Sequence, residues 1–245
     1  ANGSHLPAKL YRWVLGDLKQ DEIFIAERDE PLDLFFGAMS DGKLVLRYRS
    51  QGVSIGSTEG KSYLLCWDPK TNRSVWEVKV PNEIPRAIIQ SREGRYFAFV
   101  MDQVLYLLET STGRLQSVPE VYLNPEDRQA VLTLAFSPDQ KFLAVVLKDN
   151  SLHCIRVSDR QCVWRMKIPG GDAISLVWSK DAKTILTAAR DGYVRTIDAD
   201  IREVTVDWKL GDFGRDIEQM KLSPEEDLLY LVDREGRMYR IPLGG

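Results

Sequence analysis

The chain has 245 residues, 44% of them hydrophobic, so it is long enough to bury a sizeable core as one repeat domain. Its net charge of −3, with acidic and basic residues interspersed, argues against a nucleic-acid-binding surface, which needs a basic stripe. Apolar runs stay well short of the roughly 18 residues that suggest a membrane-spanning helix, and three cysteines are too few for a disulfide scaffold.

The N-terminal segment is expected to contain one isolated strand. Residues 1–8 are expected to be a disordered tail or the remnant of a tag, and residues 9–245 a single domain. The sequence KLYRWVLGDL, from Lys9 to Leu18, is typical of an outer strand, but the three strands that should precede it are missing. EIFIAER, at 22–28, is the alternative start of an extra repeat, which the spacing of the later serines disfavours.

Five strand–turn–strand segments follow, each with a serine at the start of its turn. An apolar strand leads into a turn rich in Asp, Glu and Gly, and a second apolar strand leaves it. Serine and aspartate side chains can bond the local backbone of such turns, and proline presets φ. The turn serines are Ser40, Ser91, Ser137, Ser179 and Ser223.

A third and a fourth strand are expected after each hairpin, except at the end of the chain. Third strands such as SYLLCWD at 62–68 alternate in polarity, as suits a half-exposed outer strand. The fourth strand carries Trp76, Trp164 or Trp208, each 15 residues before the next turn serine. Trp164 and Trp208 are 44 residues apart, and Trp76 precedes Trp164 by 88, or twice 44. A period in the low forties with four short strands predicts propeller blades.

The last repeat ends after its third strand, RMYRIP at 237–242, because only three residues remain. The simplest arrangement pairs Lys9 to Leu18 with this repeat, which closes the ring and removes exposed sheet edges. The sequence therefore predicts an all-β fold, a β-propeller of five four-stranded blades closed by the N-terminal strand. Six blades are the alternative.

The repeats resemble the WD40 family of β-propellers. The turns FSPD at 136–139 and DG at 191–192 and the dipeptide WD at 67–68 carry the resemblance, which extends over nearly the whole chain. The Gly-His pair of that family is missing from every repeat, so its Asp-His-Ser/Thr-Trp hydrogen-bond network is not carried over. The turn DPKTN at 68–72, leading to Trp76, is similar to the quinoprotein-like propellers. Both resemblances imply a propeller.

Three insertions break the repeat, at 19–31, 50–62 and 117–129. Each joins a fourth strand to the next first strand, or a second strand to a third. Because successive strands alternate in direction, both connections emerge on one face. WD40 relatives often bind on this face, and insertions in a repeat often carry function. We expect a protein or peptide partner on this face; the alternative is that the loops are merely permissive.

Basic and aromatic residues are expected at the rim of the same face. Arginine and aromatic side chains are over-represented at binding hot spots. Because Asp191, Asp212 and Asp216 lie near some of them in the sequence, pairing within the chain is the alternative explanation. The candidate partner-binding residues are Arg86, Arg190, Phe213, Arg215 and Arg234.

None of the candidate catalytic or phosphate-binding motifs in the sequence is complete. GSTEGKS at 56–62 lacks the first glycine of a phosphate loop, since Ile55 occupies that position, and joins two strands without a helix. Glycoside hydrolysis needs paired carboxylates, and only Asp33 and Glu218 begin inner strands. With His153 the one histidine inside the domain, we expect neither a Ser/His/Asp arrangement nor a metal site.

The sequence thus predicts a non-enzymatic scaffold for protein–protein interaction, without a cofactor. Neither nucleic acid nor membrane insertion is expected. The alternative is a small-ligand or glycan-active propeller with its site at the channel mouth. The chain could be one domain of a larger protein. The sequence does not determine its cellular compartment, although the cytoplasm is favoured.

Overall fold

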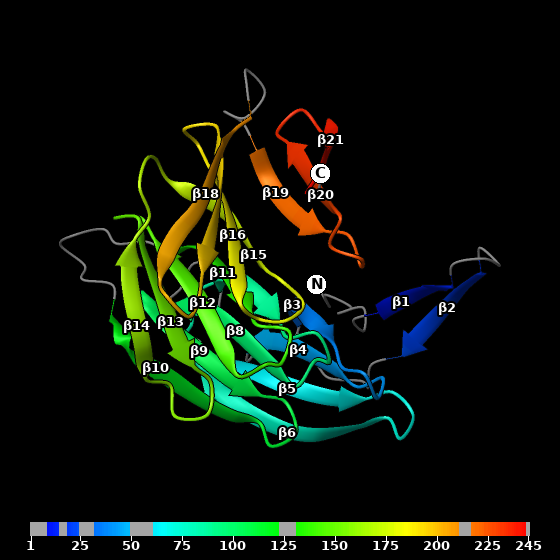
Figure 1. The fold of residues 1–245 in the computed structure, drawn as a ribbon. Coiled ribbons are helices and arrows are strands. Elements are labelled where there is room, and N and C mark those ends of the chain that lie inside the picture. The colour runs from blue at the N-terminus through cyan, green and yellow to red at the C-terminus, as the bar shows by residue number, and fades with distance from the viewer. Residues whose placement is uncertain are drawn as a thin grey trace. The chain divides into compact units, whose positions relative to one another are not determined.

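The computed structural model describes residues 9–14, 19–24, 32–49, 61–122, 131–210 and 217–243. All regular structure in these ranges is β-strand (Figure 1). The strands form one two-stranded sheet, four four-stranded sheets and one three-stranded sheet, and neighbours in each sheet are consecutive in sequence. The chain divides into two compact units, residues 1–97 with 108–116 and residues 98–107 with 117–245. Whether the two units form the single domain expected over 9–245 stays a prediction.

The first unit contains the N-terminal hairpin and one complete four-stranded sheet. The hairpin strands are β1 (Lys9–Val14) and β2 (Lys19–Phe24). The sheet strands are β3 (Leu32–Ala38), β4 (Leu44–Arg49), β5 (Ser62–Asp68) and β6 (Arg73–Val80).

The next sheet is divided between the two units. Its strands are β7 (Arg86–Gln90), β8 (Tyr96–Met101), β9 (Val104–Glu109) and β10 (Arg114–Tyr122).

The second unit contains three further sheets. The first has β11 (Val131–Phe136), β12 (Phe142–Leu147), β13 (Ser151–Arg156) and β14 (Cys162–Lys167). The second has β15 (Ala173–Trp178), β16 (Thr184–Ala189), β17 (Tyr193–Asp198) and β18 (Glu203–Lys209). The third has only β19 (Ile217–Leu222), β20 (Leu228–Asp233) and β21 (Met238–Pro242). The five sheets from β3 to β21 therefore fit the blades of the predicted propeller.

The turn serines explain the regular spacing of these hairpins. Ser137 Oγ accepts a hydrogen bond from the N–H of Phe142 at 2.9 Å and donates one to Asp139 at 2.6 Å. Ser179 repeats both bonds in the next sheet, to Thr184 at 2.9 Å and to Asp181 at 2.6 Å. Because these hydroxyls are buried and bonded on both sides, each fixes the turn between the first and second strands.

The core of the second unit lies between its sheets. The second strands β12 and β16 are buried at every residue but the first, as their apolar sequences predicted, whereas β20 alternates between half-buried and buried residues. The inner strand β11 contacts β15, and β15 contacts β19. Trp164 of β14 packs against the apolar cluster between the first two sheets, and Trp208 of β18 packs against the next cluster. These two tryptophans therefore pack between neighbouring sheets of the second unit.

The N-terminal strand is paired with the next strand in the sequence. β1 pairs antiparallel with β2, with Lys9 opposite Phe24 and Val14 opposite Lys19. Only four residues separate the two strands, so this local pairing costs little loop-closure entropy. The pairing expected for Lys9 to Leu18 is thus not observed, and β19–β20–β21 has three strands among the described residues. Closure of a ring stays a prediction.

In the ranges that the structure describes, no helix is long and apolar enough to cross a membrane.

Candidate functional site

Three equivalent turns stand at one end of the sheets in the second unit. In turns 147–150, 189–192 and 233–236, the N–H of the last residue donates to the carbonyl of the first. These last residues, Asn150, Gly192 and Gly236, all have positive φ, between 62° and 82°. We call these turns, together with the first residues of β11, β15 and β19, the entry face. These parts lie at one end of the sheets because each sheet is an antiparallel meander, in which the start of the first strand and the turn from the second to the third strand fall at the same end.

The third residue of each turn is acidic and is already paired within its own sheet. Asp149 binds Lys167 Nζ at 2.7 Å. Glu235 binds Arg237 at 3.0 Å. Asp191 binds Arg195 at 2.7 Å. The carboxylates next to the basic turn residues are therefore used by other cations.

The Asp191–Arg195 pair is the most buried of these. The Arg195 side chain is only 4% exposed, and its guanidinium donates to both carboxylate oxygens, at 3.2 and 2.7 Å. The N–H groups of Gly171 and Tyr193 also donate to Asp191, at 3.0 and 3.1 Å. Burial alone would raise the pKa of Asp191, but these hydrogen bonds and the charge of Arg195 outweigh it and lower the pKa. Asp191 is thus held ionised by groups other than Arg190.

The second residue of each turn is basic: Lys148, Arg190 and Arg234. All three side chains are exposed. Among the described residues, Lys148 and Arg190 form no ion pair, and Arg234 lies 3.6 Å from Glu218 with both side chains more than half exposed. Such an exposed pair contributes little and can be exchanged for another anion.

A cavity of about 400 Å³ joins two of these cations at the entry face. Arg190 and Arg234 line it, with Glu218 and Gln219 of β19. Its apolar lining comes from near the starts of the three inner strands, at Leu132, Ile174 and Ile217. The cavity therefore offers an apolar floor beside two arginines.

The structure brings two of the five predicted site residues together. Arg190 and Arg234 share the cavity, as residues 44 apart in a repeat of that length should. Arg86 begins β7, but its side chain is outside the described part of the structure, as are Phe213 and Arg215. Most of the insertions, at 25–31, 50–60 and 123–129, also lie outside the described residues.

Lys148 was missed by the sequence analysis. The sequence spacing could have identified it, because Lys148 precedes Arg190 by 42 residues, the same interval that separates Ser137 from Ser179. Aligning the basic turn position in the way the serines were aligned would have found it.

The catalytic alternatives find no support in the described residues. Ser62, the last residue of the phosphate-loop-like segment, is buried and accepts a hydrogen bond from Arg47 at 2.9 Å. Glu218 pairs with Arg234, which makes it a poorer candidate for a catalytic carboxylate of a glycosidase. The Asp33 side chain is outside the described part of the structure. Within that part no group of three His, Cys, Asp or Glu residues could hold a metal ion.

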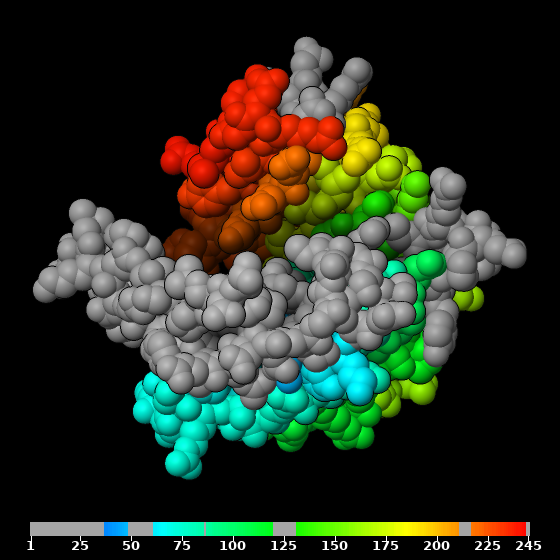
Figure 2. Space-filling model, turned by 180° about the vertical axis from the view of Figure 1, so that it is seen from behind, coloured from blue at the N-terminus to red at the C-terminus, as the bar shows by residue number. Residues whose placement is uncertain are grey.

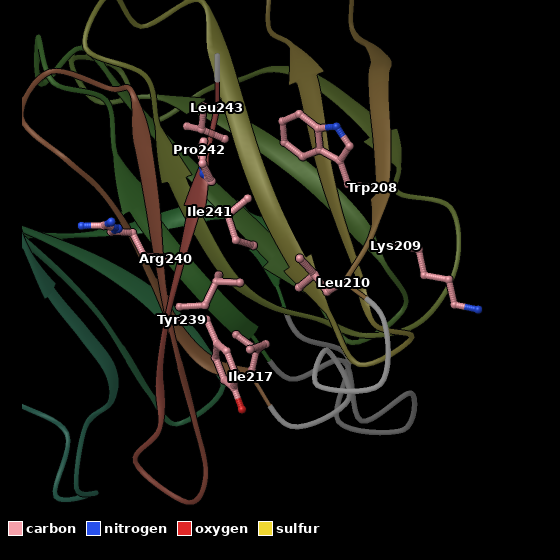
Figure 3. Close-up of a pocket in the computed structure, with 10 residues that line it drawn as sticks. Trp208, Lys209, Leu210, Ile217, Tyr239, Arg240, Ile241, Pro242 and Leu243 are labelled. Atoms are coloured by element: carbon pink, nitrogen blue, oxygen red, sulfur yellow. The ribbon is translucent and has the colours of Figure 1, made fainter. Parts of the chain in front are cut away.

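A second, apolar groove of about 730 Å³ lies between β18 and the last sheet (Figure 3). Trp208 and Leu210 line one side, and Tyr239, Ile241 and Leu243 line the other. Figure 3 shows the Arg240 side chain on the opposite side of β21 from Ile241. No sequence motif indicates a site here, because the groove is formed by residues of two neighbouring sheets.

The fold and the repeated turns define a WD40-like β-propeller, whose relatives generally serve as protein-interaction scaffolds. Residues 134–214 match the family model described as the anaphase-promoting complex subunit 4 WD40 domain. The matched stretch begins in β11 and includes the whole of the β15–β18 sheet. This match and the four-stranded sheets confirm the WD40-like fold that the turn motifs predicted.

Proposed function

We propose that the chain is a non-enzymatic scaffold that binds an acidic segment of a protein partner at the entry face. The observation that carries this proposal is the pairing of Asp191 with Arg195 rather than with Arg190. It leaves Arg190 without an internal counter-ion among the described residues, beside Arg234 and above an apolar floor. An apolar side chain flanked by carboxylates complements such a cavity.

The lining also argues against the glycan-active alternative. A glycosidase site needs two carboxylates facing one cavity, and Glu218 is the one described carboxylate that lines this one. Its nearest charged neighbour is Arg234, as expected for a rim ion pair.

The proposal is tested by reversing the two arginines together, Arg190→Glu with Arg234→Glu. Affinity capture from a lysate, with quantitative mass spectrometry, should show partners that are lost by this variant and weakened by added salt, because exposed charges are screened. The matched control is Lys141→Glu with Arg202→Glu, which changes the charge equally on exposed turns at the other end of the sheets. Partners retained equally by both variants would place binding elsewhere.

A further inference from the structure

The fourth strand of the β15–β18 sheet has one edge without a neighbour among the described residues. β18 pairs with β17 on its inner side and lies at the outer edge of the sheet (Figure 1). This sheet already has its four strands, so the expected closure of a ring at the last sheet would not use this edge. The last sheet, seen in orange to red in Figure 2, packs against the face of β18 that carries Trp208 rather than against its edge.

The backbone of two β18 residues points away from the sheet. The N–H of Leu210 donates to the carbonyl of Gly192 on the β17 side at 2.8 Å. Because the backbone groups of successive residues point alternately to the two sides of a strand, those of Trp208 also point to β17, whereas those of Asp207 and Lys209 point outward. A strand added at this edge would form its hydrogen bonds with these last two residues.

These two outward-pointing residues carry opposite charges, which makes the edge complementary to itself. In a two-fold symmetric pair of antiparallel β18 strands, one residue lies on the axis and its neighbours meet reciprocally. With Trp208 on the axis, Asp207 of each copy is opposite Lys209 of the other. An axis through Asp207 or Lys209 would place that residue opposite itself, where like charges repel. The register about Trp208 therefore combines backbone hydrogen bonds with attractive charges.

The charged side chains of this edge are accessible. Lys209 is exposed and forms no ion pair in the described part of the chain. The Asp207 carboxylate lies 3.3 Å from Nε of Arg195, but the Asp207 side chain remains 46% exposed. Arg195 already has its main counter-ion in Asp191, at 2.7 Å. The Asp207 carboxylate can therefore accept a further hydrogen bond from a lysine of a second copy.

The opposite face of the strand is apolar, and it matches itself in the same register. Val206 is 39% exposed and Leu210 is half-buried. With Trp208 on the axis, Val206 of each copy is opposite Leu210 of the other, and directly opposite residues share a face of the sheet. The irregularity in the β17–β18 register precedes Val206, so the strand is regular over this stretch. Pairing would remove an exposed valine from water.

The equivalent edge of the neighbouring sheet has the opposite property. The N–H of Ile168 donates to the carbonyl of Asn150 at 2.9 Å, which is the equivalent of the last bond of β18. By the same alternation, Arg165 and Lys167 of β14 point outward. Two β14 strands paired in this way would place basic residues opposite each other twice, and basic side chains are a common protection of sheet edges. The β18 edge lacks this protection.

We infer that the chain forms a two-fold symmetric dimer through β18, with Trp208 on the axis and reciprocal ion pairs between Asp207 and Lys209. The β15–β18 sheets of the two copies join into one continuous sheet. Because the paired stretch is short, it buries less area than a permanent dimer needs, and the dimer should form only as the concentration rises. This edge is separate from the arginine cavity, so the inference does not depend on the proposed function.

Sedimentation velocity of the 245-residue chain, from about 1 µM to about 200 µM, should show a monomer–dimer equilibrium. Lys209→Glu makes both ion pairs repulsive and should weaken the dimer at least about tenfold. Arg165→Glu, on the exposed side of β14, makes an equal change of charge and should leave the dimer unchanged. Arg190→Glu with Arg234→Glu should also leave it unchanged, which separates this edge from the entry face.

The decisive test is complementation between two variants. Asp207→Lys alone places lysine opposite Lys209, so this variant should be monomeric. Mixed with Lys209→Glu it restores both ion pairs, so the mixture should form heterodimers at concentrations where each variant alone is monomeric. Asp207→Lys also places a cation beside Arg195, so its folding is checked by circular dichroism. If it is unfolded, Lys209→Pro takes its place: proline removes an outward N–H without taking a bond from β17, and should abolish the dimer.

Several results would overturn the inference. A chain that stays monomeric at about 200 µM would show that the edge does not pair with itself. A dimer that survives Lys209→Glu would have its interface elsewhere. Equal weakening by Arg165→Glu would make the effect one of overall charge. Folded variants that form no heterodimer on mixing would show that Asp207 and Lys209 do not face each other.

Discussion

Replacing Arg195 with methionine should destabilise the protein by about 3 kcal/mol. Removing one partner of a buried ion pair costs roughly 3–5 kcal/mol, because the other charge is left buried. The lower end applies here, since Asp191 keeps the N–H groups of Gly171 and Tyr193 and its side chain is 22% exposed. Arg195 also loses its contact with Asp207 at 3.3 Å and its position over the Tyr193 ring. The ratio of folded to unfolded protein should fall by roughly a hundredfold.

Urea unfolding, followed by tryptophan fluorescence and by far-UV circular dichroism, measures this difference and tests whether the transition is two-state. The matched control is Arg190→Met in the neighbouring turn, which should change stability by less than about 0.5 kcal/mol. The pH dependence gives a second check. The folded-state pKa of Asp191 is lowered from its ordinary 3.8, so the stabilising effect of Arg195 is present above that pH and is lost as pH falls through the folded pKa.

The reasoning is refuted if Arg195→Met costs less than about 1 kcal/mol, or if Arg190→Met costs as much. The first result would mean that the Asp191–Arg195 pair contributes little, and the second that Arg190 also stabilises the fold. In either case Arg190 could no longer be considered available for a ligand.

Three further substitutions or measurements test the turns and the core. Ser137→Ala should lower the free energy of unfolding by about 1–2 kcal/mol, seen as an earlier urea midpoint, because the buried hydroxyl that accepts from the N–H of Phe142 is lost; an unchanged midpoint would contradict this role. Gly170→Ala should cost about 2 kcal/mol or more, since φ is +85° and a Cβ would overlap the Asp191 carboxylate; a soluble variant with wild-type stability would contradict it. Burial raises the pKa of Cys154 from 9.0 to about 12, so a thiol reagent at pH 8 should label it only after unfolding, and stability should be lost as pH rises above 9.0 toward that value.

The repeating part of the fold could be predicted because it is local. The turn serines act on residues five positions away, so their spacing alone marks each hairpin. The left-handed backbone at Gln140, Ala182 and Glu226 could not be predicted from the sequence. A φ near 60° usually indicates glycine, and none of these residues is glycine. The same turn in the β7–β8 hairpin does use Gly94, at φ 68°.

The candidate site could be predicted only in part. The 44-residue spacing was enough to group Arg190 with Arg234. The partner of Asp191 was not evident, because it depends on where the Arg195 side chain of the third strand points rather than on adjacency in sequence. Nor does any pattern in the last repeat show that the β21 edge is bordered by a groove, because the groove is formed with Trp208 of the preceding sheet.

The repeated turns suggest why a partner would bind at the entry face. The third turn residue is constrained, because its carboxylate ties the turn to a cation of the same sheet, as Asp149 does with Lys167 and Asp191 with Arg195. The last residue is constrained by its positive φ. The second residue makes no side-chain bond that is shared by these three turns, so its identity can change without loss of the fold. A position that folding leaves unconstrained, and that is nevertheless basic at Lys148, Arg190 and Arg234, is better explained by a ligand than by stability.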